Sequence, residues 1–181
     1  MLNPLNETTF ETHIANYLAN SDLYNQRSSA QFDIEHLCDA EMLEQFLRAQ
    51  PIVWQKLSQH FAGRETETVI REYNKRLDRG ESILNIMRKG FTVSGAKVKF
   101  CQFKPTLEGE GTENYKLYRA NRFSVVRQMR YSMGADSGNE LDLCILLNGI
   151  PLFTFELKNE GTGQNYTHGI AQYRTQRNAE N

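Results

Sequence analysis

The sequence has few of the residues and segments that mark secreted or membrane proteins. Its 181 residues include only three cysteines, Cys38, Cys101 and Cys144, whose spacing matches no disulfide, zinc or redox motif. No apolar run approaches the roughly 18 residues that a transmembrane helix needs. The N-terminus has neither the basic nor the apolar region of a signal peptide. These absences predict a cytoplasmic protein with reduced thiols.

Nucleotide- and zinc-binding motifs are missing as well. The stretch 161–164 contains two glycines but lacks the lysine of a phosphate-binding loop, so no ATP site is expected in this chain. Four dispersed histidines form no pattern of zinc ligands: His13, His36, His60 and His168.

Charge is nearly balanced over the chain but unevenly distributed along it. The net charge is -1, yet residues 64–131 hold 15 Lys or Arg against 8 Asp or Glu, while both flanking parts are acidic. A basic segment that leads into an acidic stretch suits phosphate binding beside a metal site. Solvated helix and strand faces would give the same distribution.

Apolar periodicity predicts helices first and strands later. The expected helices cover residues 7–19, 39–49, 51–62, 64–79, 81–89 and 165–178, and the expected strands cover 96–103, 122–131, 141–147 and 150–158. Residues 21–32, 104–114, 132–139 and 159–164 read as loops or turns. Asp39 is the expected N-cap of the second helix, and Asn165 or Thr167 that of the last. We expect one compact α+β (α/β-like) domain, with a mostly helical part over 1–95 and a sheet and helix over 96–181.

The stretch 139–158 organises the prediction, because two apolar runs flank an Asn-Gly pair that is typical of a hairpin turn. A two-residue loop alone would place Asp142 opposite Phe155. One further residue, as a longer loop or as a bulge near 148–151, would place Asp142 opposite Glu156. The second register is preferred because it makes one face wholly apolar.

That register has two consequences. Asp142, Glu156 and Lys158 gather at one end of the hairpin on a shared face. The opposite face is expected to be buried under helices, and its members include Leu143, Ile145, Phe153, Phe155 and Leu157.

Two carboxylates and an ammonium at one sheet end are suited to Mg²⁺ chemistry on a phosphodiester. The lysine could orient the attacking water or stabilise developing charge. A simple surface ion pair between Glu156 and Lys158 is the alternative.

Asp142 together with Glu156-Leu157-Lys158 resembles the PD-(D/E)XK nuclease motif. The ordered segments 121–128, 141–143, 148–152, 156–159, 162–164 and 172–174 resemble the N-terminal nuclease domain of type I restriction enzyme R (HsdR) subunits. The similarity is densest over 121–177 and weaker back to the first helix. Leu141 replaces the motif's proline, and Gln172 is followed four residues later by Gln176, where many relatives have tyrosine.

The resemblance implies a PD-(D/E)XK fold, a mixed sheet flanked by helices, and a Mg²⁺-dependent endonuclease acting on double-stranded DNA. It implies Asp142 and Glu156 as catalytic metal ligands, the Leu157 carbonyl as a third ligand, and Lys158 as the catalytic lysine. Glu11, on the first helix, is a further candidate ligand, and Gln172 and Tyr173 are candidates for supporting the site or contacting DNA.

The resemblance also implies partners: the methyltransferase and specificity subunits of a type I restriction complex, with ATP used by motor domains outside this chain. The nuclease core normally continues with another strand, so we expect a fragment, an engineered domain or a truncated product. The alternatives are a non-catalytic, nuclease-like module that binds DNA or a partner, and, more distantly, another small nuclease such as a junction resolvase.

Overall fold

A computed structural model describes residues 7–131, 140–158 and 165–175, and it has the expected α+β architecture. The described helices are α1 (Glu7–Ala19), α2 (Ala40–Arg48), α3 (Pro51–Phe61), α4 (Glu65–Asp78), α5 (Ile83–Lys89), α6 (Glu113–Ala120) and α7 (Tyr166–Thr175), with a 3₁₀ turn, η1, at Ser29–Gln31. The strands are β1 (Tyr24–Arg27), β2 (Phe91–Val93), β3 (Ala96–Val98), β4 (Phe123–Arg130), β5 (Glu140–Leu147) and β6 (Ile150–Phe155). The expected loops over 132–139 and 159–164 lie outside the described residues.

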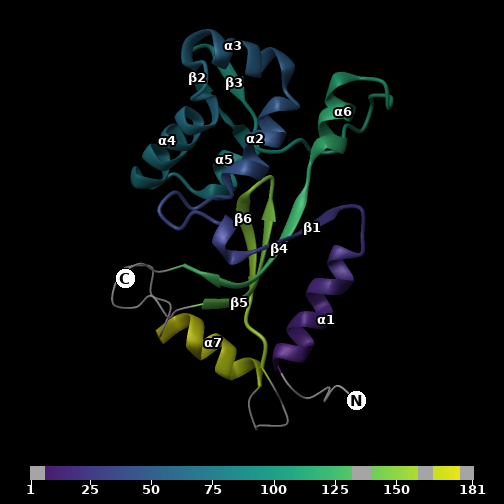
Figure 1. The fold of residues 1–181 in the computed structure, drawn as a ribbon, viewed down its shortest axis with the longest axis vertical. Helices are drawn as coiled ribbons and strands as arrows, with labels where there is room; N and C mark the ends of the chain where they lie inside the picture. Colours follow the sequence, from purple (N-terminus) through teal and green to yellow (C-terminus); the bar gives the residue numbers. More distant parts are fainter. Residues whose placement is uncertain (1–6, 132–139, 159–164, 176–181) are drawn as a thin grey trace.

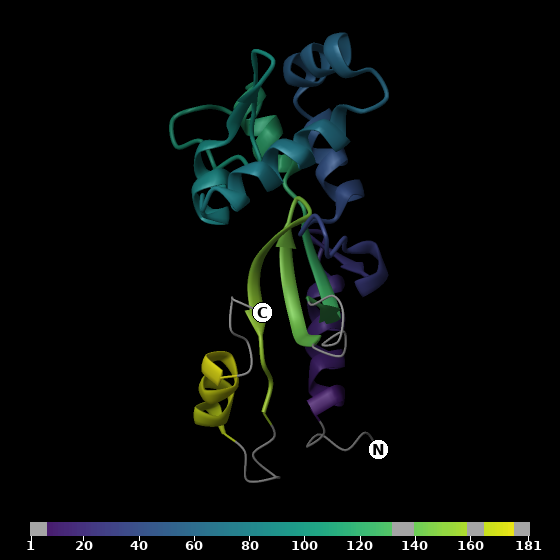
Figure 2. The same ribbon diagram turned by 90° about the vertical axis from the view of Figure 1, so that its left-hand side faces the viewer.

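The main sheet has the strand order β1-β4-β5-β6. β1 runs parallel to β4, while β4, β5 and β6 are antiparallel neighbours. Figure 1 shows this sheet in the middle of an elongated molecule, with α1 beside it and α7 next to the chain that leaves β6. In both views α1 and α7 lie on opposite sides of that chain (Figure 2).

The helices α2–α5 and the β2–β3 hairpin form what we call the helical lobe, residues 40–98, at the other end of the molecule (Figure 1). Its core is a large apolar cluster in which Tyr73, Phe100 and Leu57 are fully buried. Ile150, at the start of β6, belongs to the same cluster. The tip of the β5–β6 hairpin therefore reaches into the helical lobe, which fixes the hairpin relative to it.

The hairpin has the register expected from its apolar pattern. Leu147 pairs with Ile150 across a two-residue turn, and Leu146 pairs with Pro151. The next pair is Ile145 with Phe153, so one residue of β6 is extra and forms a bulge. Beyond the bulge Leu143 pairs with Phe155, which places Asp142 opposite Glu156.

The two faces of the sheet are covered differently. Helix α1 packs over β1, β4 and β5 and buries Ala15 against Val125 and Leu143, with Leu157 at the margin. On the other face Phe32 contacts a cluster from β4 and β5 that comprises Val126, Met129, Leu141, Cys144 and Leu146. β5, the strand that carries Asp142, is therefore packed on both of its faces.

The expected burial of Phe153 and Phe155 is wrong. Their exposed fractions are 57% and 41%, whereas Leu143 and Ile145 of the same face are buried as expected, and Leu157 is only half-buried. β6 is an edge strand of the sheet, and α1 packs over the other three strands, β1, β4 and β5. A helix that covers three strands leaves the fourth open, so the aromatic face of β6 remains in contact with solvent.

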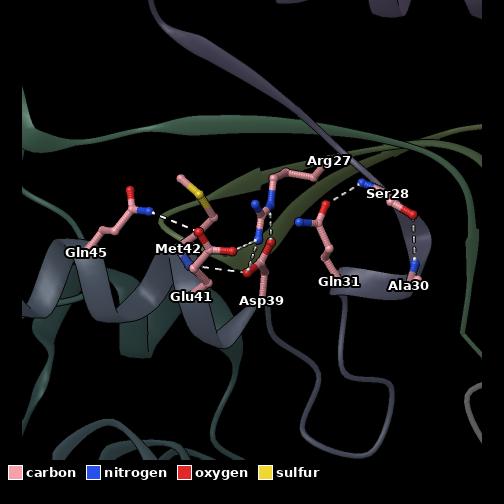
Figure 3. Close-up of polar contacts among 8 residues, drawn as sticks. All are labelled: Arg27, Ser28, Ala30, Gln31, Asp39, Glu41, Met42 and Gln45. Atoms are coloured by element: carbon pink, nitrogen blue, oxygen red, sulfur yellow. Dashed lines mark hydrogen bonds and ion pairs between the residues drawn. The ribbon is translucent and has the colours of Figure 1, made fainter.

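Residues 21–32, expected to be a loop, contain β1 and η1. β1 is polar throughout and has no alternating pattern, because an edge strand can expose both faces. Its last residue, Arg27, donates to both oxygens of Asp39, at 2.7 and 3.1 Å, and to Glu41 at 2.6 Å (Figure 3). Asp39 is the N-cap of α2, as expected, and accepts from Met42 N–H. This network ties the sheet edge to the helical lobe.

Two further elements were not expected. β2 pairs with the shorter-than-expected β3 around Ser94 and Gly95, and α6 follows a loop that ends with Thr112. Thr112 accepts a hydrogen bond from Tyr115 N–H and caps α6. Leu117 is the buried residue of α6, so its apolar periodicity is too weak to predict a helix.

Candidate functional site

The site predicted from sequence lies at the open end of the β5–β6 hairpin, remote from the turn that enters the helical lobe. Asp142 is on β5, an inner strand of the sheet, and Glu156 and Lys158 follow directly after β6. The register brings Asp142 and Glu156 opposite one another, and alternation along an extended chain places Glu156 and Lys158 on one side. The structure thus brings these three residues together.

Asp142 is held by the backbone of the neighbouring segment. Its Oδ2 accepts a hydrogen bond from Leu157 N–H at 2.5 Å. A short bond to a carboxylate is charge-assisted and fixes the orientation of the acceptor. Because the same residue, Leu157, also contacts the α1 cluster through its side chain, the position of the Asp142 carboxylate depends on how the sheet packs against α1.

Glu156 and Lys158 form an ion pair with little access to solvent. Lys158 Nζ lies 3.8 Å from Glu156 Oε2, and the exposed fractions of the two side chains are 15% and 3%. At this separation the two groups attract without forming a short hydrogen bond. Low exposure weakens screening by solvent, so each charge acts more strongly on its neighbour than it would on a surface.

A cavity of about 420 Å³ opens beside this segment. It is lined by Glu156, Leu157, Lys158, Asn165, Tyr166, Gly169 and Ile170, and thus lies between the end of the hairpin and α7. A larger cavity of about 910 Å³ lies between α2 and α4 and contains none of the predicted site residues. We place the candidate site at the smaller cavity, because Glu156 and Lys158 line it and the register places Asp142 opposite Glu156.

The remaining candidate residues from the sequence, Gln172 and Tyr173, lie on helix α7. Asn165 caps it by accepting from Thr167 N–H at 3.0 Å, as the sequence predicts. Gly169 faces the site closely, since a Cβ there would lie 3.9 Å from Lys158 Cγ. Gln172 and Tyr173 are within α7, but their side chains lie outside the described structure, and their roles stay predictions.

Glu11 is buried on α1, where it meets the sheet. Its exposed fraction is 4%, and its Oε1 accepts from Arg127 Nε on β4 at 2.7 Å. Among the described residues, no group of three or more His, Cys, Asp or Glu side chains is arranged to hold a metal ion. The role of Glu11 as a further ligand stays a prediction, and its contact in this structure is an ion pair.

The donor set at the hairpin end fits Mg²⁺. This ion commonly takes one or two carboxylates and completes its shell with water and substrate oxygens. Asp142 and Glu156 supply the carboxylates, and the Leu157 carbonyl lies between Glu156 and Lys158 in the chain. Thiols do not compete, because Cys144 points into the cluster on the Phe32 face, where burial raises the pKa of its thiol to about 12.

Two residues near the site were not singled out from the sequence. Arg127 pairs with Glu11, and Gln128 has a left-handed backbone opposite Asp142. No local pattern distinguishes an arginine or a glutamine that acts across strands.

Comparison with known protein families gives one match. The model for the N terminus of type I restriction enzyme R proteins matches residues 5–181. Comparisons with curated proteins and with solved structures found no match. In the described part of the chain, no helix is long and apolar enough to cross a membrane.

Proposed function

Because the chain belongs to the family of type I restriction enzyme R protein N termini, we propose that it is a Mg²⁺-dependent endonuclease domain that hydrolyses phosphodiester bonds in double-stranded DNA. The observation that carries the proposal is the convergence of Asp142, Glu156 and Lys158 at the open end of one hairpin. These residues place two carboxylates, which are suitable oxygen ligands for Mg²⁺, beside the Lys158 ammonium group in a site with little solvent.

In this proposal Asp142, Glu156 and the Leu157 carbonyl would hold Mg²⁺, and an ion bound there would lower the pKa of a water molecule and neutralise charge on the phosphate. Leu157 N–H keeps the Asp142 carboxylate oriented. Lys158, already 3.8 Å from Glu156, donates hydrogen bonds to the attacking water or to a phosphate oxygen as negative charge develops. The cavity toward α7 admits the scissile phosphate.

We further propose that the domain acts within a complex with methyltransferase and specificity subunits, as expected for a restriction enzyme of this family. Recognition of a DNA sequence then lies in a partner, and this chain supplies cleavage. Such a division of roles requires only that the domain contact the DNA backbone, which carries no direct sequence information.

Replacement of Lys158 tests the chemistry. Lys158→Ala should lower the rate of plasmid cleavage by the intact complex about 10²–10³-fold, the usual effect of removing one such electrostatic group. Its affinity for Mg²⁺ should stay equal or rise, because a nearby cation is removed. Lys116→Ala, at an exposed ion pair on α6, is the matched control and should cut normally. Cleavage at the wild-type rate by Lys158→Ala would favour the non-catalytic module.

Replacement of Asp142 should act by another route. Asp142→Asn keeps an oxygen that can accept from Leu157 N–H but removes the charge of the ligand. We expect weakened Mg²⁺ binding in calorimetry, loss of cleavage and an unchanged melting temperature. Unaltered metal affinity would show that the ion binds elsewhere.

A further inference from the structure

Gln128 has a backbone conformation that is unusual for its place in the fold. Its φ is +48°, in the left-handed region that is unfavourable for residues with a Cβ. Three other described non-glycine residues have positive φ, namely Leu37, Ser94 and Asn148, and all three lie in turns. Gln128 lies inside a strand, β4, and is the only residue of that strand with positive φ.

This conformation changes the direction of side chains next to the candidate site. Val126 and Met129 are three residues apart, yet both contact the Phe32 cluster, whereas strict alternation would place them on opposite faces. The flanking pairs of the β4–β5 ladder place Gln128 opposite Asp142. The irregularity is therefore located directly across from a candidate metal ligand, as strand irregularities often are.

The Gln128 side chain is exposed at a cavity of about 620 Å³ where β1 diverges from β4. Three arginines also line it, but each is already paired: Arg27 with Asp39, Arg127 with Glu11 and Arg130 with Glu140. The amide of Gln128, in contrast, makes no side-chain hydrogen bond to any residue that the structure describes. The side-chain amide of Gln128 is therefore available as a hydrogen-bond donor at the rim of this cavity.

We propose that Gln128 is a substrate-positioning residue whose amide donates a hydrogen bond to the DNA backbone, at a phosphate next to the one that is cut. Adjacent strands lie about 5 Å apart, so Gln128 on β4 and Asp142 on β5 can contact neighbouring parts of one DNA strand. The inference rests on the proposed nuclease function for its choice of substrate, and on the geometry of β4 for its choice of residue.

The presence of a side chain at this left-handed position supports the proposal. Glycine adopts left-handed φ without steric cost, so it would satisfy the backbone here as well as glutamine or better. Strained non-glycine residues cluster at functional sites, so the strain at Gln128 supports a use for its side chain. Contacts to phosphate oxygens of this kind fix the register of DNA on a protein and contribute little sequence preference.

The decisive variant is Gln128→Gly, which relieves the backbone and removes the amide. Its melting temperature should equal or exceed that of the wild type. Its affinity for a short DNA duplex, measured with the full chain at low salt without Mg²⁺, should fall about ten- to a hundredfold, the range for losing a hydrogen bond to a charged group. Ser94→Gly is the matched control, since it relieves a left-handed residue in the helical lobe and should leave binding unchanged.

Two more variants separate charge from shape. Gln128→Asn retains an amide and tolerates left-handed φ, so it should lose less affinity than Gln128→Gly. Gln128→Glu has the same shape but repels phosphate, and it should bind DNA most weakly. Wild-type affinity in Gln128→Gly, or no duplex binding by the wild-type chain, would overturn the inference.

The outcomes also distinguish this inference from the nuclease proposal. Full cleavage by Lys158→Ala, with weakened duplex binding by Gln128→Gly, would remove the nuclease role and leave the DNA contact. Cleavage that depends on Lys158, with normal binding and cleavage by Gln128→Gly, would leave the nuclease role and remove the contact.

Discussion

At the residue scale, Asn148 shows how much a single turn residue can contribute to anchoring the β5–β6 hairpin. Its side chain is fully buried, accepts from Arg122 N–H at 2.8 Å and donates to the Phe100 carbonyl at 2.9 Å and to Asn121 Oδ1 at 3.0 Å. Its left-handed φ of +51° is one that asparagine tolerates better than most residues. The next residue, Gly149, has no room for a Cβ, which would lie 2.3 Å from the Asp39 carbonyl oxygen.

We predict that Asn148→Ala lowers the free energy of unfolding by about 2–4 kcal/mol. The change leaves buried backbone groups unsatisfied, at about 1–3 kcal/mol each, and puts alanine at an unfavourable φ. Urea unfolding measures the difference. Asn25→Ala, at an exposed position of β1, is the control and should stay within about 0.5 kcal/mol of the wild type. Equal midpoints for Asn148→Ala and the wild type would contradict the anchoring role.

At the scale of elements, the β5–β6 hairpin has one well-covered strand and one open strand. Leu143 on β5 is 1% exposed beneath α1, whereas Phe153 on β6 is 57% exposed on the same face. The two residues contribute the same kind of apolar side chain to the alternating pattern. They differ in their strand: Leu143 lies on an inner strand under α1, whereas Phe153 lies on the edge strand.

This difference predicts opposite responses to truncation. Leu143→Ala should destabilise the protein by about 2–5 kcal/mol, because it opens a cavity in a packed cluster. Phe153→Ala should change stability by less than about 1 kcal/mol, because much of its ring already contacts solvent. Thermal or urea unfolding of both variants tests the pair. A large loss for Phe153→Ala would mean that another segment covers β6 in solution.

The same contrast explains what the sequence could predict. Local chemistry identified the hairpin register, the Asp142–Glu156–Lys158 set and the Asp39 cap, since each depends on residues close together in the chain or on a two-residue period. The pairing of β1 with β4 joins segments about a hundred residues apart and left no apolar pattern. The exposure of β6 and the conformation of Gln128 likewise depend on partners that the local sequence does not specify.

At the scale of the whole molecule, the helical lobe and the sheet are joined through the hairpin tip and the α2 cap. Ile150 belongs to the core of the helical lobe, Gly149 O accepts from Asp39 N–H at 2.8 Å, and Arg27 binds Asp39 from β1. The open end of the same hairpin carries the candidate site. The cluster at one end of β5 and β6 is therefore positioned by packing at the other end.

This connection predicts that the two ends unfold together, and two cysteines can report it. Cys38 lies in the core of the helical lobe and Cys144 in the Phe32 cluster of the sheet, and burial raises the pKa of each thiol to about 12. At pH 8 both should resist alkylation in the native state, because the thiolate is the reactive form. Unfolding returns each pKa to about 8.5 and makes both reactive.

Pulsed alkylation across a urea series, with each cysteine followed by mass spectrometry in a Cys101→Ser background, should give the same midpoint for Cys38 and Cys144. Asn148→Ala should shift both midpoints down together, because it weakens the anchor that both ends share. Earlier labelling of Cys38 alone would show that the helical lobe opens while the sheet stays folded, and that the hairpin tip does not couple them.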